Sequence, residues 1–248
     1  MREDFHMPPE NLDYTWRRRL LRWLLRNLVF RTLVEVRVEG IEHVPHTGGT
    51  ILMINHTGIA DPVAVAGTVD RDDMVPMSKI ENFRHPLFSI FVRAWGAFSV
   101  RRGMVDRRAL RYAVNLLKKG GSILMSPEGT RVATMKKARN GIAYVAVRAN
   151  ALLVPVAVDG ADHLLDNLKR LRRTYVTLRF GRPFRFRYKV NSEEEHVPRE
   201  LLEELTSEAM YQLANLLPEH RRGAYSDLSQ MRTDYLDFCD ECVHPSVA

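Results

Sequence analysis

A short apolar run that ends in a polar turn and a helix start constrains the fold of this chain more than any other feature. Residues 50–54 (Thr-Ile-Leu-Met-Ile) are apolar and partly β-branched, which predicts a buried strand. Asp61 and Pro62 follow shortly afterwards. A capping carboxylate before a proline, whose missing N–H costs nothing there, predicts a helix N-terminus. Strand, turn and helix in this order are the unit from which layered α/β sheets are built.

His56 lies in the turn between this strand and this helix, where α/β proteins place their sites. On a continuous helix five residues would separate His56 from Asp61 by about 140°. Across a turn, however, the carboxylate can fold back onto the imidazole, fix its tautomer and leave the other ring nitrogen to accept a proton. The spacing alone leaves a second interpretation open, in which Asp61 is only a helix cap and His56 only a polar turn residue.

Strands and helices alternate through the middle of the chain. Further strands are predicted at residues 34–38, 74–78, 97–100, 122–126, 152–158 and 174–180, and helices after Pro62 and at 84–95, 106–119, 138–150 and 199–217. This alternation predicts an α/β fold with a layered, mixed but mostly parallel central sheet flanked by helices. We divide the chain into a disordered start with a basic helix (1–33), an α/β domain (34–190), and a C-terminal helix with a polar tail (191–248).

The net charge of +7 is unevenly distributed, because residues 14–33 contain six arginines and no lysine, aspartate or glutamate. At 100° per residue, one arc of this segment carries leucines and another carries arginines. The leucines are Leu20, Leu21, Leu24 and Leu28, and the arginines are Arg18, Arg19, Arg22 and Arg26. Together with Trp16, Trp23 and Phe30, this pattern is typical of a helix that lies in a membrane interface.

Two other interpretations of residues 14–33 remain open: a helix docked on its own domain with a solvated arginine face, and a nucleic-acid-binding arm. The rest of the chain contains no RNP-like segment and no zinc finger, so nucleic acid is not an expected partner. We expect an anionic membrane surface instead. No stretch approaches 18 uncharged apolar residues, and the first residues do not resemble a secretory signal.

The two cysteines, Cys239 and Cys242, form a CxxC pair with His244 just beyond it. A structural zinc site usually needs four ligands, and the chain contains no second pair. We therefore predict no metal site.

Polar residues that are suited to catalysis or ligand binding follow three predicted strands. They are His56 with Asp61, then Arg102 with Gly103, and then the run Glu128, Gly129, Thr130 and Arg131. Because the ends of parallel strands meet at one edge of a sheet, we expect these residues to lie close together. Arginine binds phosphate bidentately, so two arginines facing a histidine indicate a phosphorylated substrate beside a general base. The chain has no Walker A loop, GxGxxG, GxSxG or HExxH motif, which favours a hydroxyl of the substrate as the nucleophile.

With these motifs the chain resembles the PlsC-type lysophospholipid (1-acylglycerol-3-phosphate) acyltransferases, which share four blocks in a fixed order. The matching residues are Asn55, His56 and Asp61; Gly96 to Val100 with Arg102-Gly103; Glu128, Gly129, Thr130 and Arg131; and Val154-Pro155. The resemblance covers roughly residues 36–160, and four blocks in order are far more specific than any single one.

The resemblance implies acyl transfer to the free hydroxyl of 1-acylglycerol-3-phosphate, which gives phosphatidic acid. It assigns His56 as the base that deprotonates the hydroxyl and Asp61 as the residue that orients it. The donor would be acyl-CoA or acyl carrier protein, with no acyl-enzyme intermediate and no cofactor or metal. The protein would lie at the cytoplasmic face of a membrane, as a peripheral or monotopic enzyme.

The resemblance also assigns the acceptor site. Arg102 and Arg131 would hold the acceptor phosphate, and Glu128, Gly129 and Thr130 would shape its pocket. Two departures leave the acceptor headgroup open: Ser126 replaces a frequent phenylalanine, and Arg101 adds a charge. Two alternatives therefore stand beside the main hypothesis, namely the same chemistry on another lysophospholipid or a glycolipid, and a catalytically silent lipid-binding module.

Overall fold

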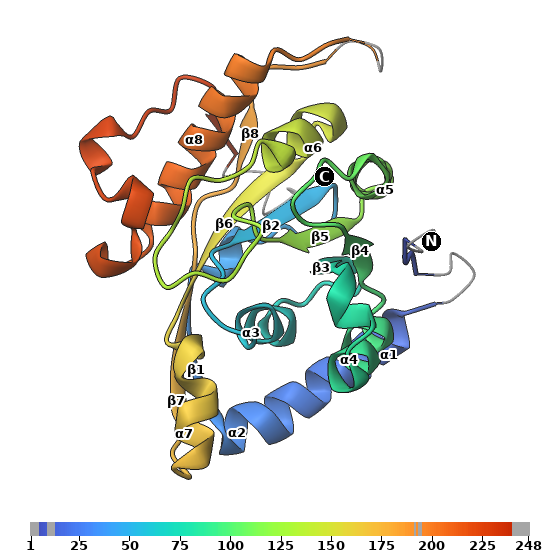
Figure 1. The fold of residues 1–248 in the computed structure, drawn as a ribbon, viewed down its shortest axis with the longest axis vertical. Coiled ribbons are helices and arrows are strands. Elements are labelled where there is room, and N and C mark those ends of the chain that lie inside the picture. Colours follow the sequence, from blue (N-terminus) through green and yellow to red (C-terminus); the bar gives the residue numbers. More distant parts are fainter. Residues whose placement is uncertain (1–4, 9–12, 191, 193–194, 240–248) are drawn as a thin grey trace, which may run out of the picture.

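The computed structural model describes residues 5–8, 13–190, 192 and 195–239. In these ranges nine strands form one sheet, with β1, β7, β6, β2, β5, β3 and β4 side by side and β8 and β9 attached to β6 (Figure 1). The strands are β1 (Val34–Glu39), β2 (Thr50–Ile54), β3 (Met74–Lys79), β4 (Phe98–Val100), β5 (Ser122–Met125), β6 (Leu152–Asp159), β7 (Thr174–Phe180), β8 (Phe184–Phe186) and β9 (Leu236–Phe238).

The sheet is mixed and mostly parallel, as predicted. β2 pairs in parallel with β5 on one side and β6 on the other, and β3 pairs in parallel with both β4 and β5. β7 runs antiparallel to β6 and parallel to β1, and the pairs β6–β8 and β8–β9 are antiparallel. The predicted strands are present, whereas β8 and β9, of three residues each, were not predicted.

Helices cover both faces of the sheet (Figure 1). They are α1 (Thr15–Leu24), a π-helical turn (Leu25–Val29), α2 (Phe30–Thr32), α3 (Asp61–Thr68), α4 (Pro86–Ala94), α5 (Arg107–Lys118), α6 (Gly141–Ala149), α7 (Leu164–Lys169) and α8 (Arg199–Asn215). All five residues of β2 are buried, and they alternate between two cores. Ile51 and Met53 pack with α5, α6 and α8, while Leu52 and Ile54 pack with α3 and the N-terminal helix.

The N-terminal helix turns its arginines toward the domain. Arg18 and Arg22 are buried; Arg22 pairs with Asp72, and Arg18 donates to the carbonyl oxygens of Trp95 (2.9 Å) and Asp72 (2.7 Å). Arg26 donates to the carbonyl oxygens of Gly67 and Thr68, at the end of α3.

The opposite arc of the helix faces outward, with Trp16, Trp23 and Leu28 more than half exposed at 56%, 59% and 59%. The predicted helix is present, but the alternative in which it docks on the domain with a solvated arginine face does not hold for Arg18 and Arg22, which are buried. The physical reason is the acidic turn after α3, which offers carboxylates and free carbonyl oxygens to guanidinium donors. An amphipathic pattern identifies two faces without saying which one meets the domain.

Both ends of the chain are more ordered than expected where they are described. The backbone N–H of His6 donates to Ser99 Oγ (2.8 Å) and the N–H of Ser99 donates to the His6 oxygen (2.9 Å), so residues 5–8 lie along β4 instead of being disordered. At the other end, β9 pairs with β8 and Leu236 is buried. The predicted polar tail therefore contributes to the sheet as far as Phe238.

Candidate active site

Asn55 fixes the chain where it leaves β2. Its amide group forms two hydrogen bonds to Val158 of β6: Nδ2 donates to the carbonyl oxygen (2.8 Å), and Oδ1 accepts from the N–H (2.7 Å). Because an amide side chain carries both a donor and an acceptor, it continues the pairing of β2 with β6 by one residue. His56, the next residue, is thereby held at the end of the strand.

Asp61 folds back onto the turn instead of capping α3. Its fully buried carboxylate accepts the backbone N–H groups of Thr57 (2.6 Å) and Gly58 (2.7 Å), and its Oδ2 lies 3.0 Å from His56 Nδ1. Ala60 occupies the N-cap position, so the prediction of an Asp61 cap is wrong. The predicted contact between the carboxylate and the imidazole is present. When Nδ1–H donates to Asp61, Nε2 is the ring nitrogen that remains to accept a proton.

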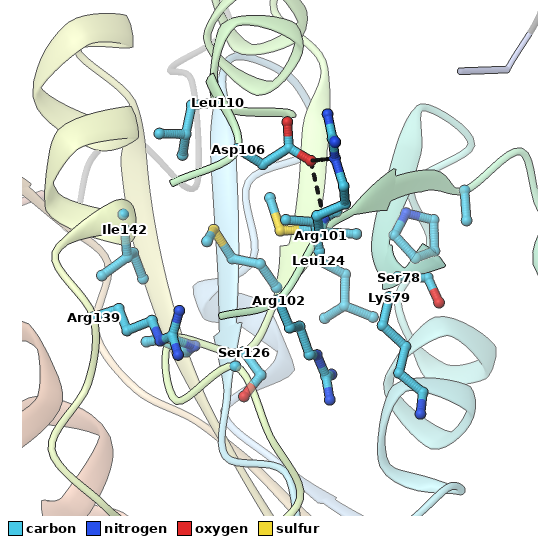
Figure 2. A pocket seen from close by; sticks show the side chains of 18 of the residues that line it. Ser78, Lys79, Arg101, Arg102, Asp106, Leu110, Leu124, Ser126, Arg139 and Ile142 are labelled. Atoms are coloured by element: carbon cyan, nitrogen blue, oxygen red, sulfur yellow. Dashed lines mark hydrogen bonds and ion pairs between the residues drawn. The ribbon is translucent and has the colours of Figure 1, made fainter. Parts of the chain in front are cut away.

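A cavity of about 1490 Å³ opens beside His56 (Figure 2). Segments that follow β2, β3, β4 and β5 line it, together with helices α3 to α6. Its apolar wall comes from α3, α4 and the residues next to them, namely Ile59, Val63, Phe88, Phe91, Val92 and Trp95. The histidine thus lies where an apolar wall meets the polar ends of the strands.

The lining of this cavity is strongly basic, with nine lysine or arginine residues against a single acidic residue, Asp106. Five of the nine lie at the ends of strands or just before α6: Lys79, Arg101, Arg102, Arg131 and Arg139. The other four come from α5 and α6: Arg107, Arg111, Lys118 and Arg148. Such an excess of one charge in a concave site favours anionic ligands.

Arg102, Arg131 and Arg139 form the part of this lining that suits a phosphate. Burial lowers the pKa of Arg102, and the positive charges of Arg131 and Arg139 lower it further. Figure 2 shows Lys79, Arg102 and Arg139 reaching into the cavity from three separate segments. Sequence reasoning selected Arg102 and Arg131 but missed Lys79 and Arg139, which lie outside the motifs.

Arg101 does not join this group. Its backbone N–H donates to Asp106 Oδ2 (3.0 Å), and its guanidinium Nε lies 3.6 Å from the same oxygen. Asp106 also caps α5 by accepting the N–H groups of Arg108 and Ala109. In Figure 2 Arg101 and Asp106 lie together, and the Arg102 side chain extends the opposite way. The extra charge noted in the sequence is therefore paired.

Glu128 points into the protein and not into the cavity. It is buried, and its Oε2 accepts the backbone N–H of Lys136 (3.0 Å), while Oε1 has no hydrogen-bond partner among the described residues. Burial raises its pKa to about 7. Of the three residues predicted to shape the phosphate pocket, Gly129 lines the cavity, whereas Glu128 and Thr130 do not; Arg131, predicted to hold the phosphate, also lines it. Gly129 adopts φ +66°, a conformation that favours glycine.

The segment after α8 braces the loop that carries these residues. Arg221 pairs with Asp159 (3.1 Å) and Asp162 (2.9 Å) and donates to the carbonyl oxygen of Ala133 (3.2 Å). The N–H of Met135 donates to the Arg221 oxygen (2.9 Å). Sequence reasoning missed this contact, because nothing local marks Arg221, which is 88 positions away from Ala133 in the loop that it holds.

The described residues contain no group of three or more His, Cys, Asp or Glu side chains that could hold a metal ion. Cys242 and His244, two members of the CxxC-His motif, lie outside the described residues. None of the helices in the described ranges is both long and apolar enough to cross a bilayer.

The Acyltransferase family model matches residues 35–159, which is half of the chain. The chain belongs to the acyltransferase family. The matched range contains β1 to β6 and all four sequence blocks, whereas the bracing Arg221 lies outside it. His56, Asp61 and the other motif residues therefore lie in the part of the chain that the family model covers.

Curated relatives and one solved structure agree with this assignment. The 1-acyl-sn-glycerol-3-phosphate acyltransferase of Streptococcus pneumoniae (strain ATCC BAA-255 / R6) is 32% identical over 134 residues, which are 54% of this chain and 49% of the relative. The protein of the same name from Bacillus subtilis (strain 168) is 26% identical over 125 residues, 50% of this chain and 63% of the relative. The matches thus span about half to two thirds of these relatives.

The solved structure is that of the 1-acyl-sn-glycerophosphate (LPA) acyltransferase PlsC from Thermotoga maritima. It superposes with a TM-score of 0.58 at 22% identity and covers 77% of this chain and 76% of its own. This similarity establishes that the acyltransferase shares the PlsC fold.

Proposed function

We propose that this acyltransferase moves a fatty acyl group from acyl-CoA or acyl carrier protein to the free hydroxyl of 1-acylglycerol-3-phosphate, giving phosphatidic acid. The observation that carries the proposal is the pairing of His56 with the buried Asp61 at the wall of a cavity that also holds Arg102 and Arg131. A base, a phosphate site and an apolar wall are the three elements that this reaction requires.

His56 acts as the general base in this mechanism. Its Nε2 takes the proton of the acceptor hydroxyl while the hydroxyl oxygen attacks the carbonyl carbon of the thioester. The tetrahedral intermediate then expels the thiolate of the donor, which takes the proton back from the imidazolium. Asp61 holds the ring in one tautomer and stabilises its positive charge between the two transfers.

The cavity lining orients both substrates around the histidine. The guanidinium groups of Arg102 and Arg131 hold the acceptor phosphate, and Gly129 lets the backbone approach it. The apolar wall along α4, with Phe88 and Phe91, accommodates an acyl chain. No cofactor or metal enters the reaction, because the thioester already supplies an activated acyl group.

The outward face of the N-terminal helix holds the enzyme on a membrane surface. Trp16, Leu20, Trp23 and Leu28 are exposed along one side of it, and tryptophans of this kind are favoured at the lipid–water interface. The attachment therefore comes mainly from apolar contact, since the arginines on the opposite side are already paired. We place the enzyme at the cytoplasmic face, as a peripheral or monotopic protein, with no nucleic-acid partner.

Purified protein incubated with lysophosphatidate and radiolabelled acyl-CoA tests the proposal, with His56→Ala as the control. We expect labelled phosphatidate from the unmutated protein only. Equal product from both proteins would remove His56 from the mechanism. Product on another lysophospholipid or a glycolipid alone would change the acceptor, and vesicle binding without turnover on any acceptor would support a silent lipid-binding module.

A further inference from the structure

The basic lining of the cavity extends well beyond the cluster that suits the acceptor phosphate. Arg107 and Arg111 lie one turn apart on α5, and Lys118 lines the same cavity two turns further along. From Arg107 to Lys118 this row covers roughly 16 Å of helix axis at 1.5 Å per residue. A single phosphate held by Arg102 and Arg131 is too small to contact the whole row.

Arg107 and Arg111 have no role within the fold. Both are exposed, and neither forms a hydrogen bond or ion pair with another described residue. α5 is held to the sheet by its other face, where Ala109, Ala113 and Leu117 are buried. The two arginines therefore add positive charge to the cavity without a partner, although Asp106, the one acid in the lining, is close in sequence and already caps the helix.

We propose that this α5 row binds the phosphate of the acyl donor's carrier, namely the 4′-phosphate of the phosphopantetheine arm that coenzyme A and acyl carrier protein share. The inference rests on the proposed function, which requires two phosphorylated substrates in one cavity. Leu110 and Val114 line the cavity between the arginines and give the pantetheine arm an apolar floor. In Figure 2 Leu110 borders the same space as Arg102, on the side away from Lys79.

In this arrangement the acceptor phosphate and the donor phosphate are bound by different elements of the fold. The acceptor phosphate is bound by residues that follow β4 and β5, and the donor phosphate by the outer face of α5. A thioester at His56 can then extend its apolar chain along α4 and its phosphorylated arm along α5. Guanidinium groups are suited to both sites because they donate bidentately to phosphate.

Steady-state kinetics of Arg111→Gln and of the Arg107→Gln/Arg111→Gln double variant test this assignment. Each substitution removes one charge-assisted contact, so we expect the donor KM to rise roughly tenfold per arginine, about 1.4 kcal/mol each, with the acceptor KM unchanged. Arg108→Gln is the matched control: Arg108 is exposed on the same turn of α5 but does not line the cavity. The donor KM of this variant should stay within twofold of the parent value.

The choice of donor distinguishes the sources of the anion. A raised KM with both acyl-CoA and acyl carrier protein supports the shared phosphopantetheine phosphate, and a raised KM with acyl-CoA alone supports a phosphate of the nucleotide. A rise with acyl carrier protein alone would overturn the assignment in favour of an acidic protein surface. A rise in the acceptor KM, or no rise at all, would overturn it as well.

Binding of free coenzyme A, measured by calorimetry, separates this inference from the proposed function because it needs no turnover. Weaker binding by the double variant than by Arg108→Gln supports the α5 site even if no acceptor is acylated. Equal binding by the two would contradict the site while leaving the acyl transfer reaction untouched.

Discussion

The arginines of the N-terminal helix and the arginines of the cavity are the same residue type in opposite situations. In the helix, Arg18 and Arg22 are buried and are paired with carboxylates or carbonyl oxygens. In the cavity, Arg102 and Arg131 lie among other cations, and burial together with the charges of Arg131 and Arg139 lowers the pKa of Arg102. Asp70 and Asp72 pair with three of the six arginines in the segment that holds six of the seven net charges. The domain that appeared almost neutral contains the strong positive site.

This difference shows that a count of charges along a sequence predicts neither the local electrostatic potential nor the role of an individual arginine. An arginine whose partners come from its own chain stabilises the fold, whereas an arginine left among like charges is stabilised when an anion binds. Substitutions in the two regions should therefore change different quantities.

The largest effect is expected in the helix. Arg22→Gln removes a buried guanidinium, leaves Asp72 with only the exposed Arg19 as its ion-pair partner, and takes one of the donors from the carbonyl oxygen of Arg71. We expect the free energy of unfolding to fall by about 3 kcal/mol, measured by urea denaturation. Arg31→Gln is the control, since Arg31 is exposed and has no hydrogen bond or ion pair among the described residues. An Arg22→Gln variant as stable as Arg31→Gln would show that the helix is not held by these pairs.

Substitution of a cavity arginine should change the kinetics and leave the stability of the fold intact. We expect Arg102→Gln to lower kcat/KM for the acceptor by roughly 10- to 100-fold, about 1.4–2.8 kcal/mol, because a charge-assisted contact to phosphate is lost. The free energy of unfolding should not fall, and relief of repulsion from Arg131 and Arg139 should raise it slightly. Arg102→Lys keeps the charge but loses the paired donors of the planar guanidinium, and it should recover part of the activity. A destabilised Arg102→Gln with normal kinetics would cancel the distinction between the two regions.

These two regions also show which parts of the structure can be predicted from the sequence. The motifs and the order of strands and helices predicted the fold and the meeting of His56 with Asp61, because local periodicity and turn chemistry determine them. The inward orientation of Arg22 and the brace of Arg221 could not be predicted, since both depend on partners about 50 residues away or more. Glu128 followed its motif in position but not in orientation, because a motif says nothing about which way a loop side chain turns.

The outward side of the helix sharpens the comparison further. Trp23→Ser should weaken binding to vesicles of phosphatidylglycerol and phosphatidylcholine about tenfold, because a side chain that inserts into the interface is lost. Arg19→Gln should change binding much less, since Arg19 is already paired with Asp72 at 2.6 Å. Vesicle sedimentation measures both. A larger loss of vesicle binding in Arg19→Gln than in Trp23→Ser would show that the arginines make the main membrane contact.

The smallest effect concerns two carboxyl groups whose pKa values move in opposite directions. Asp72 contacts the N-terminal helix, and Glu128 lies in the loop that carries Gly129 and Arg131. Burial alone would raise the pKa of Asp72, but hydrogen bonds from Arg22 and Arg19 outweigh it and lower the pKa below its ordinary value of 3.8. Asp72 therefore stabilises the fold above that pH and loses this contribution as the solution becomes more acidic.

Burial raises the pKa of Glu128 from 4.5 to about 7, and the nearby charge of Lys136 does not offset this. Between these values the folded protein binds more protons than the unfolded chain, so its stability falls as the pH rises through this window. After allowance for solvent screening the loss is on the order of 1 kcal/mol. Thermal unfolding at pH 5 and pH 8 measures it, and Glu128→Gln, which keeps an acceptor for the Lys136 N–H, should abolish the difference. If the variant and the parent lose the same stability between the two pH values, the buried carboxyl is not what titrates.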